Sequence, residues 1–174
     1  MSINNIRKSM SYERKILDWK NIYTTNCYAY AMGIDIPQTD ICKYAYDVGQ
    51  ISRMIDCEDE EELPDPKYHN TNTFEWELTW DFDTLGLEFE ESSKIELKPD
   101  EIPNYPGRYF DILFFIHKYR NDFHFARFGK DGKLYHKRGF NLAPQETTVD
   151  FIESDNYEFA KRYRLYLSKG PFYK

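Results

Sequence analysis

Two stretches in the first half of the chain carry apolar residues at helical spacing. The first covers residues 11–22 and leads into residue 23, and its apolar side chains recur at spacings of four, three and four: Tyr12, Ile16, Trp19 and Tyr23. The second covers residues 73–85, and its apolar face consists of Phe74, Leu78, Phe82 and Leu85. Asn72 with Glu75 three residues later predicts the start of this second helix, and Gly86 predicts its end. We therefore expect two amphipathic helices in this half.

From residue 95 onward the apolar pattern changes to the two-residue period of strands. Strands are expected at residues 95–97, at 109–116, on both sides of a hairpin between 122 and 136, and finally near 163–167. In the last strand, apolar and cationic residues alternate: Tyr163, Leu165 and Leu167 against Arg162 and Arg164. Because helices come first and antiparallel strands follow, the sequence predicts an α+β fold in which residues 1–174 form one domain.

The composition indicates a core built from aromatic rings. Aromatic residues make up 18% of the chain, with 15 Tyr and 13 Phe, whereas the mean hydropathy is only −0.77. The net charge of −7 argues against a nucleic-acid partner and against an anionic membrane surface, because both need clustered Lys and Arg.

The cysteines and the first residues bear on the compartment. Cys27, Cys42 and Cys57 are odd in number and form no Cys-x-x-Cys pair, which argues against a disulfide framework or a zinc ribbon. The first residues lack the apolar stretch of a secretory signal, and no run of eighteen apolar residues follows. We expect a cytoplasmic protein without a membrane partner, or one exported without a classical signal peptide.

Cys27 stands at the start of a predicted short helix that ends at Gly33. Hydroxyl and amide residues precede it, and Thr24 or Thr25 can cap the helix. A thiol at a helix start has a lowered pKa, and backbone N–H groups there can hold an oxyanion. A lone buried cysteine is more often an inert apolar residue, so this signal needs support from elsewhere in the chain.

That support comes from His124 and His136, which stand twelve positions apart in the predicted hairpin. If the loop has three residues and Gly132 is left-handed, Ala126 faces His136 and both imidazoles lie on one side as diagonal neighbours. A two-residue turn would send them to opposite faces. The longer loop therefore allows His124 to act as general base to Cys27 while His136 orients its ring.

Other interpretations of these histidines remain open. They can be polar positions on an exposed strand face, or they can bind zinc together with Cys27, since three protein ligands and a water make an open site. Asn141 competes with His136 as the orienting residue but falls beyond the expected end of the strand. His69 and His117 are expected to be exposed and outside the site.

Three segments resemble one group of proteins: residues 26–31 (N-C-Y-A-Y-A), 122–125 (D-F-H-F) and 135–137 (Y-H-K). The group consists of bacterial proteins of largely unassigned role and is similar to a branch of the NlpC-like, papain-related cysteine hydrolases. The resemblance implies a papain-like fold with Cys27 as nucleophile, His124 as base and His136 as orienting residue. Tyr28 follows the cysteine where these enzymes usually have Ser, so the resemblance does not extend to their stem-peptide pocket.

Together these features predict a thiol-dependent hydrolase of the peptidase, amidase or deamidase type. Cys27 would attack the carbonyl of a peptide, a protein or another amide-containing substrate, and His124 would protonate the leaving amine. Asn26, Tyr23 and Tyr28 are the candidates for holding the oxyanion or the substrate. We expect no cofactor and no metal ion. The alternatives are an acyltransferase on the same residues and a non-catalytic papain-like binding module.

Overall fold

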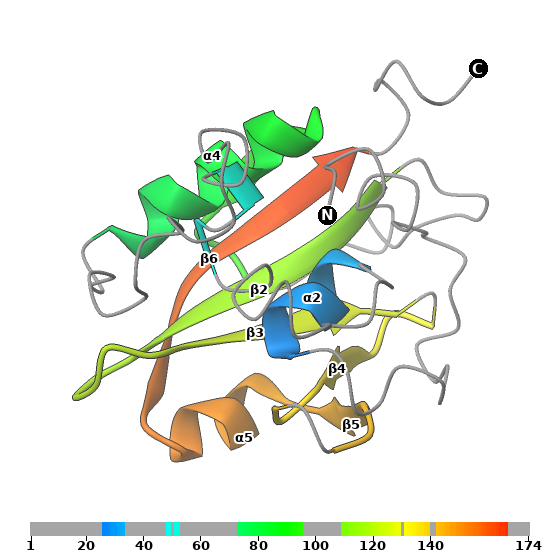
Figure 1. The fold of residues 1–174 in the computed structure, drawn as a ribbon. Coiled ribbons are helices and arrows are strands. Elements are labelled where there is room, and N and C mark those ends of the chain that lie inside the picture. The colour runs from blue at the N-terminus through cyan, green and yellow to red at the C-terminus, as the bar shows by residue number, and fades with distance from the viewer. Residues whose placement is uncertain are drawn as a thin grey trace.

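In the computed structural model of the protein, the described residues are 26–33, 48–49, 51–52, 73–95, 109–129, 131–139 and 142–166. They form an α+β structure around a six-stranded antiparallel sheet, as predicted (Figure 1). The strands are β1 (Glu88–Ser92), β2 (Tyr109–His117), β3 (Phe123–Phe128), β4 (Leu134–His136), β5 (Gln145–Thr147) and β6 (Tyr157–Tyr166). Their spatial order is β1-β6-β2-β3-β4-β5, so the last strand lies between the first two.

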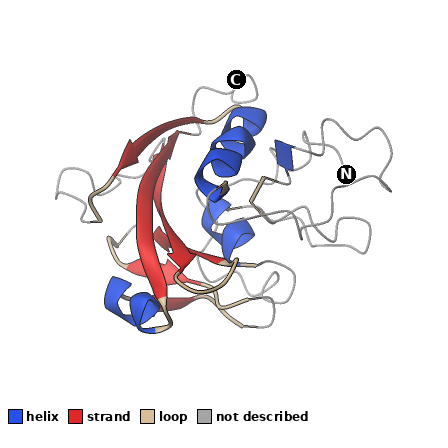
Figure 2. Ribbon diagram, turned by 90° about the vertical axis from the view of Figure 1, so that its left-hand side faces the viewer, coloured by secondary structure: helices blue, strands red, loops and turns tan. Residues whose placement is uncertain are grey.

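Helices cover both faces of this sheet. Figure 2 shows the sheet as a curved layer, with α2 (Cys27–Met32) and α4 (Phe74–Leu85) on one side and α5 (Val149–Ser154) on the other. None of the described helices is long and apolar enough to cross a membrane.

Successive side chains of a strand point to opposite faces of the sheet, so each face has its own apolar core. In β2, Ile112 and Phe114 pack toward α2 and α4, whereas Leu113 and Phe115 pack in a second cluster with Ile152 of α5. The first cluster is rich in fully buried rings, which confirms the expected aromatic core. The second cluster contains one fully buried ring, Phe115, with the partly buried rings of Phe128, Tyr157 and Phe159 packed against it. Each fully buried ring contributes about 2 to 3 kcal/mol through the apolar area it removes from water.

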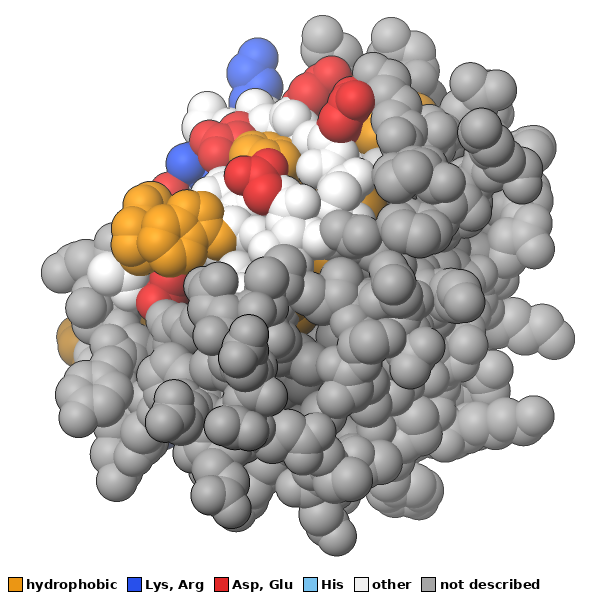
Figure 3. Space-filling model, turned by 45° about the horizontal axis from the view of Figure 1, so that its top comes forward, with side chains coloured by type: hydrophobic (Ala, Val, Ile, Leu, Met, Phe, Trp, Pro, Cys, Tyr) orange, Lys and Arg blue, Asp and Glu red, His pale blue; other side chains and the backbone are white. Residues whose placement is uncertain are grey.

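The second predicted helix is confirmed as α4, with its apolar face buried: Phe74, Leu78, Phe82 and Leu85. Gly86 ends it in the left-handed conformation, at φ 66°. The predicted cap at Asn72 is wrong, because the N-cap is Thr73, whose side chain makes no capping hydrogen bond. On the outer side of α4, the rings of Trp76 and Trp80 contact each other with centroids 3.9 Å apart and planes tilted by 38°. The two residues remain 52% and 45% exposed. Figure 3 shows a hydrophobic patch on this side of the molecule among acidic side chains.

Three short elements have no counterpart among the predictions. β1 contains a single large apolar residue, Phe89, β5 contains none, and α5 is only six residues long. Ile95, expected in a strand, lies outside any strand, and β6 begins at Tyr157, earlier than predicted. The helix predicted at residues 11–22 and the rest of the 95–97 strand lie outside the described residues.

Candidate active site

Cys27 is the first residue of α2, as predicted, but the cap differs from the expected one. Asn26 is the N-cap, and its side-chain oxygen accepts a hydrogen bond from the Ala29 backbone N–H at 2.9 Å. Gly33 closes the helix in the left-handed conformation at φ 68°. The capping bond engages the Asn26 side-chain oxygen within the helix start, next to Cys27.

The histidine hairpin has the predicted three-residue loop. Gly129 donates its backbone N–H to the Lys133 carbonyl at 2.8 Å, and Gly132 is left-handed at φ 74°. Ala126 consequently pairs with His136, as expected. This register places His124 and His136 on the same face of the sheet.

The two imidazoles are hydrogen-bonded to each other. Nε2 of His124 lies 2.9 Å from Nδ1 of His136, and the rings are nearly perpendicular, at 88°. Both side chains are buried, with 8% and 2% of their surface exposed. His136 is therefore the partner of Nε2 of His124, and Nδ1 is the ring nitrogen of His124 that remains for another partner. The alternative residue, Asn141, lies outside the described residues.

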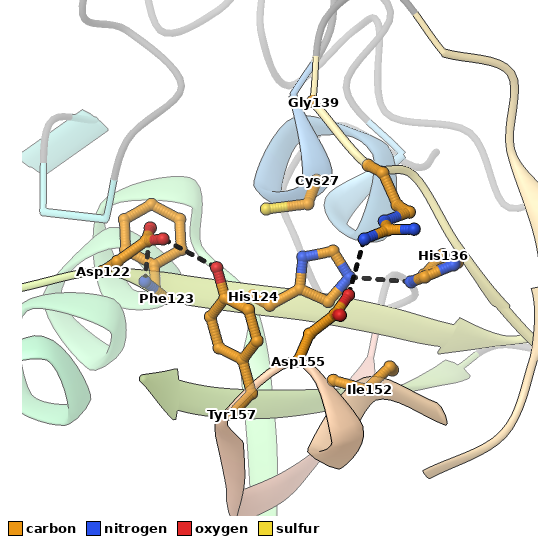
Figure 4. Close-up of a pocket in the computed structure, with 10 residues that line it drawn as sticks. Cys27, Asp122, Phe123, His124, His136, Gly139, Ile152, Asp155 and Tyr157 are labelled. Carbon is orange, nitrogen blue, oxygen red and sulfur yellow. Dashed lines mark hydrogen bonds and ion pairs between the residues drawn. The ribbon is translucent and has the colours of Figure 1, made fainter. Parts of the chain in front are cut away.

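Cys27 meets the histidines at an opening in the sheet. Helix α2 packs on the face of the sheet opposite to the two imidazoles, where Tyr28 contacts Phe125 with ring centroids 5.1 Å apart. The β3–β4 ladder ends at the Ala126–His136 pair, however, so β4 no longer covers β3 alongside His124. A pocket of about 280 Å³ lies there, lined among others by Cys27, His124 and His136. Figure 4 shows the His124 ring beside the Cys27 side chain, with His136 on its other side.

Burial keeps both imidazoles neutral. It lowers the pKa of His124 to about 3, with the charges of His136 and Arg138 acting in the same direction. Burial and Arg138 lower the pKa of His136 to about 4, which Asp155 opposes. At neutral pH each ring therefore carries a single N–H, and His124 can accept a proton.

Lys137, which the sequence analysis did not single out, is a buried cation close to Cys27. The residue is 1% exposed, and its ammonium donates a hydrogen bond to the carbonyl of Gly139, which lines the pocket. Burial lowers the pKa of Lys137 to about 8, and a negative charge on Cys27 opposes this shift. The two groups therefore interact electrostatically, and the ammonium favours the thiolate form of Cys27.

The remaining pocket walls hold two polar pairs that were also missed. Tyr157 donates its hydroxyl to Asp122 at 2.6 Å, and its ring lies 5.5 Å from that of His124. Arg138 and Asp155 form a half-exposed ion pair at 2.6 Å. Asp122 is the first residue of the D-F-H-F motif and could have been noticed there, whereas Tyr157 and Asp155 come from a distant turn that no motif marks.

Tyr28, another predicted site residue, is not among the residues that line the pocket. Tyr28 is fully buried, and its hydroxyl donates to Asp81 at 2.7 Å, so its position is structural instead of substrate-binding. Tyr23 lies outside the described residues, as does His69. His117, expected to be exposed, is buried, and its Nδ1 accepts hydrogen bonds from the next loop.

The histidine pair is not arranged as a metal site. Two ligands of a tetrahedral zinc each lie about 2.0 Å from the ion and direct their lone pairs at it. Here the two nitrogens instead face each other at hydrogen-bonding distance. Among the residues that the structure describes, no group of three His, Cys, Asp or Glu side chains could hold a metal ion.

The pocket brings together the three side chains that the sequence singled out. A buried thiol, a neutral imidazole and a second imidazole bonded to the first share one pocket. Comparison with family models, with curated proteins and with solved structures gives no match for this chain.

Proposed function

We propose that this protein is a papain-like, thiol-dependent hydrolase that cleaves an amide bond. The observation that carries the proposal is the shared pocket of Cys27 and the hydrogen-bonded His124–His136 pair. A nucleophile at a helix start, a base on a strand and an orienting group on the adjacent strand are the parts that thiol hydrolases require. The resemblance of residues 26–31, 122–125 and 135–137 to NlpC-like proteins supports the same assignment.

The reaction would begin with attack of the Cys27 sulfur on the substrate carbonyl carbon. The thiol proton passes to Nδ1 of His124, and the carbonyl oxygen becomes an oxyanion facing the backbone N–H of Cys27. His124 then returns the proton to the leaving nitrogen as the carbon–nitrogen bond breaks, which leaves an acyl group on Cys27. Water attacks this thioester with His124 again as base, and the acid product and the free thiol are regenerated.

The charges around the pocket fit this sequence of steps. A neutral His124 has a ring nitrogen that can accept the thiol proton, but its low pKa makes it a weak base; the same low pKa means that it readily gives the proton back to a leaving amine. The Lys137 ammonium stabilises the sulfur's negative charge, a role that an uncharged imidazole cannot fill. Thus activation of the thiol would be divided between a buried cation and a neutral base.

Trapping the acyl-enzyme tests this proposal. The full-length protein is incubated with a panel of N-acyl coumarin amides, and intact mass and released coumarin are measured together. We expect an acyl adduct on Cys27 that is lost in Cys27→Ser and in His124→Ala. The product mass then distinguishes transfer to water from transfer to an added amine. An acyl adduct that persists in Cys27→Ser would contradict the assignment of the nucleophile.

The same pocket would suit a non-catalytic binding module if its thiol were inert. Titration of Cys27 with a thiol-directed electrophile, such as a vinyl sulfone, separates the two. Stoichiometric modification supports the hydrolase, whereas a folded protein that leaves Cys27 unmodified supports the module.

A further inference from the structure

A hydrogen-bonded chain of three side chains leads from the pocket across three neighbouring strands. Gln145, the first residue of β5, pairs directly with His136 of β4. The nitrogen of its side-chain amide lies 3.2 Å from Nε2 of His136. Nδ1 of His136 in turn lies 2.9 Å from Nε2 of His124. The side chains of Gln145, His136 and His124 are thus hydrogen-bonded in series. Nδ1 of His124 is the ring nitrogen nearest Cys27 (Figure 4).

Two neutral imidazoles joined by one hydrogen bond allow only two proton arrangements. In the first, the Gln145 NH₂ group donates to Nε2 of His136, so His136 carries its proton on Nδ1 and donates it to His124. His124 then carries its own proton on Nδ1 and cannot accept another there. In the second, the Gln145 oxygen accepts from Nε2 of His136, every donor reverses, and Nδ1 of His124 presents a lone pair.

We propose that Gln145 is a positioning residue that selects the proton arrangement of the histidine pair. With its amide oxygen toward His136, His124 presents the basic nitrogen to Cys27; a half-turn of the amide removes that basicity. In the structure the amide nitrogen faces His136. Because the oxygen and nitrogen of an amide have nearly the same shape, a half-turn that brings the oxygen there fits the same heavy-atom positions. The catalytic consequence rests on the proposed hydrolase function, but the selection of the proton arrangement does not.

The groups around the pair are compatible with this role. The charges nearest the imidazoles are Arg138 and Asp155, and these two are paired with each other. Neither contacts His136 Nε2 through a hydrogen bond that competes with Gln145 in the described structure. Gln145 itself is exposed, so replacing it does not open a cavity in the core.

Gln145→Glu and Gln145→Met separate the two arrangements. A carboxylate can only accept from His136, so the Glu variant should hold the arrangement in which His124 is protonated on Nε2. Met can neither donate nor accept, so both arrangements should be populated. Glu146→Gln is the matched control, because Glu146 is the next residue of β5 and pairs with Tyr135 on the opposite face.

The direct readout is the ¹⁵N NMR spectrum of the histidine rings at pH 7, which reports the protonated nitrogen without any turnover. We expect His124 to be protonated on Nε2 in the wild type, in Gln145→Glu and in Glu146→Gln, and to become a mixture in Gln145→Met. The rate of Cys27 alkylation should fall about fivefold in Gln145→Met, the effect expected from one lost hydrogen bond. Equal melting temperatures establish that all variants are folded.

A proton arrangement unchanged in Gln145→Met would overturn the inference. Protonation of His124 on Nδ1 in the wild type would instead contradict its role as the base of the proposed hydrolase. An unreactive Cys27 in a protein whose proton arrangement still responds to residue 145 would contradict the hydrolase alone and leave the role of Gln145 intact.

Discussion

The protonation of a few buried side chains sets the chemistry of this protein at the scale of single residues. His124 and His136 are neutral because burial disfavours their charged forms, and Arg138 lowers the pKa of both rings further. Lys137 remains cationic below about pH 8 and interacts electrostatically with Cys27. The three shifts have a common cause, which is removal of these groups from water.

The low pKa of His124 predicts a loss of stability on acidification. The folded-state pKa is about 3, below the ordinary value of 6.5, so the unfolded chain takes up a proton that the folded protein does not. This contribution is therefore present above pH 6.5 and lost as pH falls toward 3. Between pH 7 and pH 5 the free energy of unfolding should fall by about 2 kcal/mol more in the wild type than in His124→Gln. Urea unfolding of both proteins at both pH values measures this difference. An equal fall in the free energy of unfolding in the wild type and in His124→Gln would contradict it.

Removal of the Lys137 charge should make the thiol of Cys27 less reactive. Lys137→Met keeps most of the apolar stem but removes the ammonium, so the thiolate should form at higher pH. We expect alkylation of Cys27 at pH 7 to slow by about tenfold, which corresponds to a shift of about one pKa unit. Lys133→Met is the control, since this exposed lysine of the same hairpin pairs with Glu146. Identical pH–rate profiles for Lys137→Met and the wild type would rule out this role.

At the scale of elements, strong local patterns were predictable and weak ones were not. The apolar stripe and terminal glycine of α4 and the Gly132 loop of the β3–β4 hairpin were sufficient to predict both elements. β1 and β5 were missed because edge strands with one or no large apolar residue have no detectable period. α5 was missed because six residues are too few to establish one.

The candidate site divides in the same way. Cys27, His124 and His136 could be identified because one short helix and one hairpin place them, and both are specified locally. Gln145 could not be found, because its contact with His136 requires the unpredicted β4–β5 pairing. Lys137 was missed because a lysine in a sequence gives no sign of burial beside a cysteine.

Asp81 links α4 to two other parts of the structure and should make stability depend on pH. Its buried carboxylate accepts hydrogen bonds from Tyr28, Gly49 and Ser52 at 2.7 to 2.8 Å. Burial nevertheless outweighs these bonds and raises its pKa from 3.8 to about 6. The stability that Asp81 contributes is thus greatest below pH 4 and is lost as pH rises through 6.

Asp81→Asn, which cannot titrate, isolates this effect. It should be less stable than the wild type by about 1 to 3 kcal/mol, because Asn supplies a single acceptor oxygen to three donors. The deficit measured by urea unfolding should be larger at pH 4 than at pH 7. A deficit that grows with pH would mean that the hydrogen bonds outweigh burial.

At the scale of the whole molecule, the site exists only when distant segments assemble. Cys27 and His124 are separated by 97 positions, and docking of α2 on β3 brings them together. Arg127 contributes to this docking by donating to the Ala31 carbonyl at 3.4 Å, from the strand that carries His124. Reactivity of Cys27 should therefore disappear together with tertiary structure.

Substitution of Cys27, the proposed nucleophile, should separate function from folding. Cys27→Ser preserves size and hydrogen bonding but raises the pKa of the attacking group by several units. We expect the acyl-enzyme to be lost while the melting temperature changes by only a few degrees, whereas His136→Ala should be milder than His124→Ala. Calorimetry and acyl-enzyme mass measure the two effects. A large loss of stability in Cys27→Ser would instead identify Cys27 as a core residue.

The rate of alkylation by iodoacetamide as a function of pH tests the central claim, that Cys27 is an activated nucleophile, most directly. Peptide mass mapping follows the three cysteines of the folded protein separately. Cys27 should react at pH 7 about tenfold faster than Cys42 and Cys57, with a thiolate titration below the ordinary value of about 8.5, and this advantage should vanish in urea. Equal, slow alkylation of all three cysteines in the folded protein would contradict the account.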